Sequence, residues 1–219
     1  DRIGVSFEEE KRKERTPAPS LPVEENLLDD REDHVMYRES GEGNTYGDDN
    51  EFGFKLDVPE HRFNLGEVYN LCIARGTLTE EERFKINDHI VQTIIMLEQL
   101  PFPRHLKKVP EYAGGHHEKM DGTGYPKKLN RDQMTVPARM MAIADIFEAL
   151  SAADRPYKAA KKLSDCIKIM SFMKKDAHID ADLFKLFLTS GVYKEYADKF
   201  LKPEQLDDVD ISQYLEAED

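Results

Sequence analysis

The stretch of sequence that decides the fold is His116-His117-Glu118-Lys119-Met120-Asp121-Gly122-Thr123-Gly124-Tyr125-Pro126. Its closely spaced Gly122, Gly124 and Pro126 force a loop, because glycine and proline both favour turns. A helix should begin near Pro110 and run towards the two histidines, weakened at its end by two glycines. The sequence therefore predicts a helix that ends at a histidine pair and opens into a loop.

Upstream of this loop, a longer helix begins at the capping box Thr79-Glu80-Glu81-Glu82, whose last residue can reach back to the first amide. The helix should run to about Leu100, because Pro101 stops it. Its apolar residues recur at three- and four-residue steps and so form one buried face: Ile86, Ile90, Ile94 and Leu97. His89 lies within this series, near the edge of the buried face.

Downstream of the loop, the segment from about Pro137 to Ala153 predicts a helix that is apolar on nearly every side and therefore central. Within its residues 140–147, Asp145 is the one ionisable group. A carboxylate buried there costs roughly several kcal/mol unless a cation or hydrogen bonds offset the cost. We therefore expect Asp145 to bind a cation or, alternatively, to cap or bridge helices.

Further helices are predicted towards the C-terminus, at Ser164–Lys174 with a Ser cap and at Asp180–Ser190 with an Asp cap. Gly191 follows the second of these, as glycine commonly follows a helix end. A terminal helical turn is expected around Tyr193–Leu201. A short hairpin within Phe52–Asn70 is the one candidate for β-structure, so the predicted fold class is all-α.

The first part of the chain differs in composition from the rest. The charged segment from Glu8 to Arg15 predicts an exposed helix; prolines and acidic residues follow it, and residues 39–53 are rich in Gly, Asp, Glu and Asn. This is the composition of loops and linkers. We therefore expect an acidic, partly disordered insertion or linker over residues 1–60 and a helical domain over residues 61–219.

The bulk composition of the 219 residues excludes several classes of protein. A net charge of −13 argues against nonspecific binding of a nucleic-acid polymer, which needs a basic face. No apolar run is long enough for a membrane span or for a signal peptide, so a cytoplasmic chain is expected. Cys72 and Cys166 lie in helix-like apolar patterns and are predicted to be buried free thiols. A small phosphate-bearing substrate stays possible where metals and local cations reverse the field.

Four residues are candidates for a metal site: His89, His116, His117 and Asp145. Nitrogen and oxygen ligands without thiolates suit iron, manganese or zinc in an open catalytic site. The alternative is that these are ordinary core or surface residues, the interpretation adopted for the remaining histidines, His34, His61, His105 and His178. Residue types and spacing leave both interpretations open.

The run from His116 to Pro126 resembles the signature of HD-GYP domains, a branch of the HD superfamily of metal-dependent phosphohydrolases. Gly76–Glu82 resembles the segment that leads into the helix with the ligand histidine in this family. Ala138–Asp145 resembles the helix with the last metal aspartate, and Asp154–Lys158 resembles the Arg-Pro-Tyr segment after it. The resemblance covers roughly residues 70–160 and implies an all-helical HD-like fold.

The resemblance also implies a function and assigns residues to it. Such domains hold two or three iron- or manganese-type ions and typically hydrolyse the bacterial messenger cyclic di-GMP. By analogy, the metal ligands are His89, His116, His117 and Asp145, and the contacts to the nucleotide are Tyr125, Arg155 and Lys158. The loop Gly122, Gly124, Tyr125 and Pro126 would place an aromatic ring where a guanine can stack; its alternative role is a rigid turn or a contact surface for a signalling protein.

One part of the family pattern has no counterpart in the chain. The His-Asp dyad that gives the family its name is absent, since no His-Asp dipeptide occurs, and the best echo of its segment is Asp1-Arg2-Ile3-Gly4. Either the chain is cut inside its domain or the dyad has been lost. We therefore expect this chain to hold only the second half of the metal site. The two predicted functions are a phosphodiesterase module for cyclic di-GMP or a related nucleotide in bacterial signalling and, alternatively, a catalytically degenerate sensor or docking module.

Overall fold

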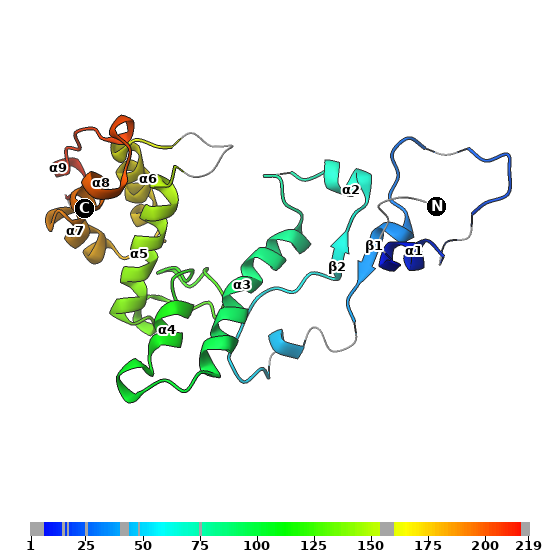
Figure 1. Cartoon of the computed structure of the whole chain (residues 1–219), viewed down its shortest axis with the longest axis horizontal. Coiled ribbons are helices and arrows are strands. Elements are labelled where there is room, and N and C mark those ends of the chain that lie inside the picture. The colour runs from blue at the N-terminus through cyan, green and yellow to red at the C-terminus, as the bar shows by residue number, and fades with distance from the viewer. Residues whose placement is uncertain are drawn as a thin grey trace. The chain divides into compact units, whose positions relative to one another are not determined.

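The computed structural model describes residues 7–14, 16, 18–24, 26–39, 44–47, 49–74, 76–153 and 160–215 (Figure 1). Its α-helices are α1 (Phe7–Lys13), α2 (Glu67–Leu71), α3 (Glu80–Glu98), α4 (Val109–Gly114), α5 (Val136–Ser151), α6 (Leu163–Lys175), α7 (Ala181–Thr189), α8 (Val192–Phe200) and α9 (Ser212–Leu215). Short 3-10 turns are η1 (Glu32–His34), η2 (Asn44–Tyr46), η3 (Arg104–Leu106), η4 (Arg131–Gln133) and η5 (Pro203–Gln205). The strands β1 (Val35–Tyr37) and β2 (His61–Asn64) form one small sheet, so the all-α fold class is confirmed.

The chain divides into two compact units. The first consists of Asp1–Glu51 and Asp57–Asp88, and the second of Phe52–Leu56 and His89–Asp219. The division falls within α3, between Asp88 and His89. The compositional boundary predicted between residues 60 and 61 lies inside the first unit and stays a prediction about sequence character.

In the first unit, the sheet joins segments that are distant in sequence. β1 and β2 are antiparallel, with Met36 opposite Phe63. The hairpin predicted within Phe52–Asn70 is therefore wrong: β2 lies in that range, but its partner is β1, far upstream. The predicted exposed N-terminal helix is confirmed as α1, whose first turn is acidic and last turn basic, the order that the helix dipole favours.

The start of α3 is as predicted. The Thr79 N–H donates to Glu82 Oε2 at 2.9 Å, and the Glu82 N–H donates to Thr79 Oγ1 at 3.2 Å, which is a complete capping box. Of the predicted buried face, Ile90 and Ile94 are buried, but Ile86 is 52% exposed. Ile86 is exposed because Phe84 and Asp88, one turn apart, occupy the buried side of this part of the helix.

In the second unit, α5 is central, because α4, α6 and α7 all pack on it (Figure 1). The core is continuous from α5 to α8: Ile143, Phe147, Leu163, Cys166, Ile167, Met170, Ile179, Phe184, Leu188, Tyr193 and Ala197. The central position predicted for this helix is confirmed, but burial on nearly every side is wrong. Met140, Met141, Ala144 and Asp145 are exposed along one side.

The helices after α5 differ in how their first turns are capped. The predicted Asp cap of α7 is confirmed, since Asp180 Oδ1 accepts the N–H of Asp182 and of Leu183, both at 3.0 Å. The Ser cap of α6 is wrong. Ser164 lies inside the helix, and its N–H and hydroxyl donate to the carboxylate of Asp207 at 2.9 and 2.6 Å. A distant acidic residue thus satisfies the exposed amide there.

Two further predictions concern cysteines and membranes. Both cysteines are free; Cys166 is buried as predicted, whereas Cys72 is exposed, which corrects the expectation of burial. Among the described helices, none combines the length and the apolar composition that crossing a bilayer requires.

Candidate metal centre

Three histidines of the second unit meet at one place. His89 lies on α3, and His116 and His117 follow the end of α4; one ring nitrogen of each lies within 4.8 Å of the others. His89 is exposed rather than at a buried edge, and the other two are half-buried. Because α4 stops at Gly114, the adjacent histidines lie in a turn and not on the helix itself. Among the described histidines, cysteines and carboxylates, these three side chains form a group that could hold an ion.

A backbone carbonyl fixes the orientation of the His116 ring. Its Nδ1 lies 2.6 Å from the carbonyl oxygen of Ala113. A carbonyl can only accept, so Nδ1 is the donor in this bond and Nε2 is the ring nitrogen left for an ion. A backbone carbonyl that holds one ring nitrogen in this way is the usual support of a metal-binding histidine.

His117 is held in its neutral form. Burial, together with the neighbouring His116 and His89, lowers the pKa of His117 to about 4, although Asp145 acts in the opposite direction. Neutral imidazole is the form that binds metal ions. The site therefore needs no loss of a proton from this ring at neutral pH.

The donor geometry fits a divalent cation. His117 Nε2 lies 3.1 Å from His89 Nε2, so one ring nitrogen of each histidine faces the other. Two imidazole nitrogens bound to one divalent ion at about 2.1 Å, at right angles to each other, lie about 3 Å apart. The spacing of these two nitrogens is therefore close to that of two imidazole ligands on one ion.

Asp145, the fourth predicted ligand, behaves differently from the expectation. Its side chain is exposed on α5 and not buried, because α5 leaves one side uncovered. It is not a member of the group formed by the three histidines. Its charge nevertheless acts on the cluster: it raises the pKa of Tyr125 and partly opposes the lowering of the pKa of His117.

The loop after the histidines is closed by Glu118. Its side chain is only 1% exposed, and its two oxygens accept the N–H of Lys127 at 2.6 Å and of Leu129 at 2.8 Å. Burial raises the pKa of Glu118, and the two N–H groups oppose that rise. A buried carboxylate requires such partners, and here they come from the far end of the loop.

Gly124 is required for the same closure. A Cβ at this position would lie 2.4 Å from the backbone nitrogen of Lys119 and 2.5 Å from Cα of Glu118. No side chain fits against backbone atoms at those distances. Gly124 therefore lets the second half of the loop cross directly over the first.

The loop carries Tyr125 onto the histidines. Its ring stacks on His117, with centroids 4.8 Å apart and planes at 19°, and its N–H donates to the His117 carbonyl at 3.2 Å. Burial and the charge of Asp145 raise the pKa of Tyr125, so its phenol keeps its proton. The next residue, Pro126, is buried and accepts the N–H of Lys55 at 2.7 Å.

The predicted site residues thus divide into three sets. Those brought together are His89, His116, His117 and Tyr125, with Gly122, Gly124 and Pro126 shaping the loop between them. Asp145 lies beside them. Arg155 and Lys158, predicted to contact the nucleotide, lie outside the described residues. The motif contains Glu118, but the sequence predicted no role for it. Its hydrogen-bond partners lie nine and eleven residues later, which is too far for a local sequence pattern to indicate them.

Comparison with known proteins places these residues in a family. A profile of the HD domain family matches residues 22–183, more than half of the chain. The 3'3'-cGAMP-specific phosphodiesterase 3 of Vibrio cholerae serotype O1 is 40% identical over 123 residues, which is 55% of this chain and 25% of that protein. The 3'3'-cGAMP-specific phosphodiesterase 1 of the same organism is 35% identical over 116 residues, 53% of this chain and 26% of that protein. A cyclic di-GMP phosphodiesterase of Pseudomonas aeruginosa is 38% identical over 79 residues, 36% of this chain and 18% of that protein. The chain spans at most about a quarter of the length of these relatives.

Proposed function

Because the chain belongs to the HD domain family, and within it to the HD-GYP branch, we propose that it is a metal-dependent phosphodiesterase module for a cyclic dinucleotide. The relatives' names give cyclic di-GMP and 3'3'-cGAMP as their substrates. The ion is iron or manganese, with zinc as the alternative, because the donors are imidazoles and no thiolate lies among them.

The observation that carries the proposal is the cluster of three histidines with Tyr125 stacked against it. His117 offers a neutral ring, His116 offers Nε2 because its Nδ1 donates to Ala113, and His89 completes the donor set. A divalent ion bound there would supply activation of water and neutralisation of charge on a phosphodiester. Asp145, as the nearby carboxylate, is proposed as the fourth ligand.

The chain's own residues have separate roles in this proposal. Tyr125 presents its ring beside the cluster, where a nucleobase can stack, and its protonated hydroxyl can donate to the substrate. Glu118 and Gly124 position that ring by closing the loop. Arg155 and Lys158 are proposed to bind the phosphates, the first through its planar fork and the second as a point charge.

A second function is supported by one feature of the cluster. Among the described residues, the group offers three donors, enough for one ion, while a two-ion centre needs more. A chain that binds the nucleotide or a signalling protein through the loop Gly122–Pro126, without turning substrate over, fits that donor count. This is the degenerate sensor or docking module.

Metal analysis combined with hydrolysis assays separates the two functions. The purified chain is loaded with manganese or iron, its bound metal is measured by elemental analysis, and hydrolysis of cyclic di-GMP and 3'3'-cGAMP is followed. Metal binding with turnover supports the phosphodiesterase; nucleotide binding without turnover supports the sensor. His117→Ala should abolish metal binding, whereas the exposed His105→Ala, outside the cluster, should leave it unchanged.

Asp145 and Tyr125 are tested on the same preparation. Asp145→Asn should lower metal content and leave helicity intact, because the side chain is exposed. Unchanged metal content would remove Asp145 from the ligand set. Tyr125→Phe should keep nucleotide binding that depends on stacking, and Tyr125→Ala should lose it; equal affinities for the two variants would exclude stacking on this ring.

A further inference from the structure

The first unit contains a polar cavity that the proposed phosphodiesterase function does not use. Its volume is about 150 Å³, and it lies between β2, the end of β1 and the first turns of α3. Three cationic side chains line it: Arg38, Arg62 and Lys85. The chain as a whole has a net charge of −13, so three cationic side chains around one small cavity differ from its general acidic character.

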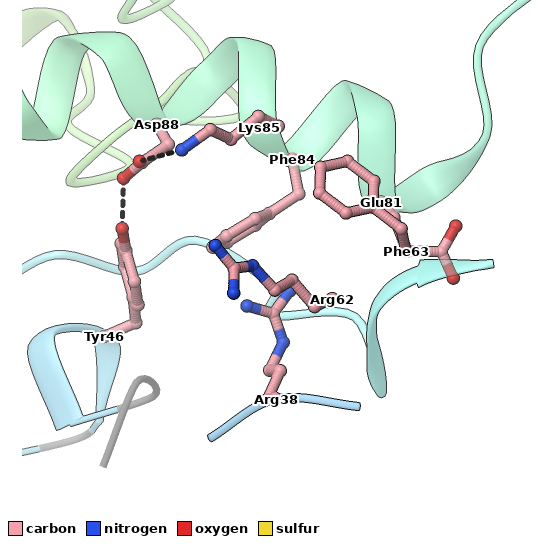
Figure 2. Close-up of a pocket in the computed structure, with 8 residues that line it drawn as sticks. All are labelled: Arg38, Tyr46, Arg62, Phe63, Glu81, Phe84, Lys85 and Asp88. Atoms are coloured by element: carbon pink, nitrogen blue, oxygen red, sulfur yellow. Dashed lines mark hydrogen bonds and ion pairs between the residues drawn. The ribbon is translucent and has the colours of Figure 1, made fainter. Parts of the chain in front are cut away.

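The two arginines converge on one aromatic ring. The guanidinium carbon of Arg38 lies 4.9 Å from the centroid of the Phe84 ring, and Arg38 Nε donates to the carbonyl of Pro59 at 2.9 Å. Figure 2 shows the guanidinium groups of Arg38 and Arg62 turned toward each other beneath this ring. Phe84 is buried, so it fixes the place of the guanidinium group that rests on it.

The two carboxylates in the wall are already engaged. Asp88 accepts a short hydrogen bond from the Tyr46 hydroxyl and lies 3.8 Å from the ammonium of Lys85 (Figure 2). Glu81 accepts from the hydroxyl of Tyr69 at 3.1 Å. Burial, and then this bond with Glu81, raise the pKa of Tyr69, so the phenol stays a donor. Each carboxylate therefore accepts from a hydroxyl, and the lining contains three cationic and two carboxylate side chains.

Size narrows the class of ligand. A buried water molecule needs a cavity of only about 10–15 Å³, whereas drug-sized ligands occupy pockets of about 300–1,000 Å³. The cavity is thus large enough for a tetrahedral anion and too small for a cyclic dinucleotide. Guanidinium groups match phosphate oxygens in pairs through their planar, forked arrangement of N–H donors.

We infer that this cavity binds a small phosphate-bearing anion, held between Arg38 and Arg62 with Lys85 at the rim. Inorganic phosphate and the terminal phosphate of a nucleotide share the required chemistry. The site is separate from the histidine cluster, and its ligand needs no metal ion.

Calorimetric titration of the full chain tests the inference, with inorganic phosphate, GMP and guanosine as probes. A chelator is present throughout, so that phosphate cannot bind through an ion at the histidines. Phosphate and GMP should bind saturably, and guanosine should not. The tighter of the first two identifies the source of the phosphate group, and either result supports the site.

The variants assign binding to the cavity. Arg62→Gln, an exposed position, should weaken phosphate binding at least about tenfold, since hydrogen bonds to charged groups are the strong ones. Arg38→Lys keeps the charge but loses the fork and should also weaken binding. Arg104→Gln, an exposed arginine of the second unit, and His117→Ala should bind as the unaltered chain does. Absence of saturable binding, or an equal loss in Arg104→Gln, would overturn the inference.

Discussion

The two units of the chain are stabilised by different kinds of contact. In the described part of the first unit, the buried side chains are Phe84 and four polar residues, Asp33, Thr79, Glu81 and Asp88. In the second, an apolar core runs from α5 to α8. The first unit therefore depends on specific hydrogen bonds, and the second chiefly on removal of apolar surface from water.

The second unit nevertheless contains a buried polar centre that links several elements, Asp180. Its carboxylate is 1% exposed and pairs with Arg131 at 2.9 Å and with Arg139, besides capping α7. The difference between the units is thus not between polar and apolar cores alone. In the second unit the buried carboxylate of Asp180 joins η4, α5 and α7, whereas in the first the buried carboxylates act separately.

Replacing Asp180 should have the largest effect. Asp180→Ala leaves the partly buried Arg139 without its partner and should lower the free energy of unfolding by about 3–5 kcal/mol. Asp182→Ala removes only the exposed partner of Arg131 and should cost at most about 1 kcal/mol. Urea unfolding followed by circular dichroism measures both. Equal effects would mean that the second unit has no special polar centre.

The same carboxylate predicts a pH dependence. Burial opposes the charge on Asp180, but the Leu183 N–H, Arg139 and Arg131 outweigh it and hold its pKa below the ordinary value. A depressed pKa stabilises the fold above the pKa of the unfolded chain, about 3.9, and this stability is lost as pH falls through the lower folded value. The stability difference between the unaltered chain and Asp180→Asn should therefore shrink below about pH 4. A constant difference down to pH 2 would contradict the assignment.

A glycine substitution tests the loop next. Gly124→Ala forces a methyl group against backbone atoms and should cost about 1–3 kcal/mol, together with most of the metal binding. Gly53→Ala meets no atom within 4 Å, so it should cost only the strain of its positive φ, about 1 kcal/mol. Its metal content should stay unchanged. Thermal unfolding and elemental analysis of the two variants separate loop geometry from general destabilisation.

The smallest expected effect is at the start of α3. Thr79→Ala removes one bond of the capping box and should cost about 1 kcal/mol. Thr77→Ala, an exposed residue two positions earlier, should change stability by less than about 0.5 kcal/mol. If the first unit depends on single hydrogen bonds, Thr79→Ala should lower its free energy of unfolding more than Thr77→Ala does.

Local chemistry made much of the fold predictable. The capping box at Thr79, the Asp cap at Asp180 and the glycine at 191 each act within a few residues, and the helices they delimit were predicted correctly. The three histidines were also predictable, because two are adjacent and the motif joins them to the loop. His89 joins them because α3 packs near α4. At this contact the Ile94 side chain occupies the place where a Cβ at position 114 would lie, so Gly114 is required.

Contacts between distant segments were not predictable. The cap of α6 comes from Asp207, which lies 43 residues after Ser164. The partner of β2 is a strand far upstream, and Asp145 is exposed because no described segment covers that side of α5. Each of these depends on which segments meet, and periodicity describes only one segment at a time.

The hydrogen bonds of Glu118 have a consequence for variation in the loop. Its two partners donate through their main chains, so the identities of the side chains at 127 and 129 do not enter the bond. Any residue except proline can supply the same N–H. The surface of the loop can therefore be redesigned at these two positions, in charge or in shape, while Tyr125 keeps its place beside the histidines.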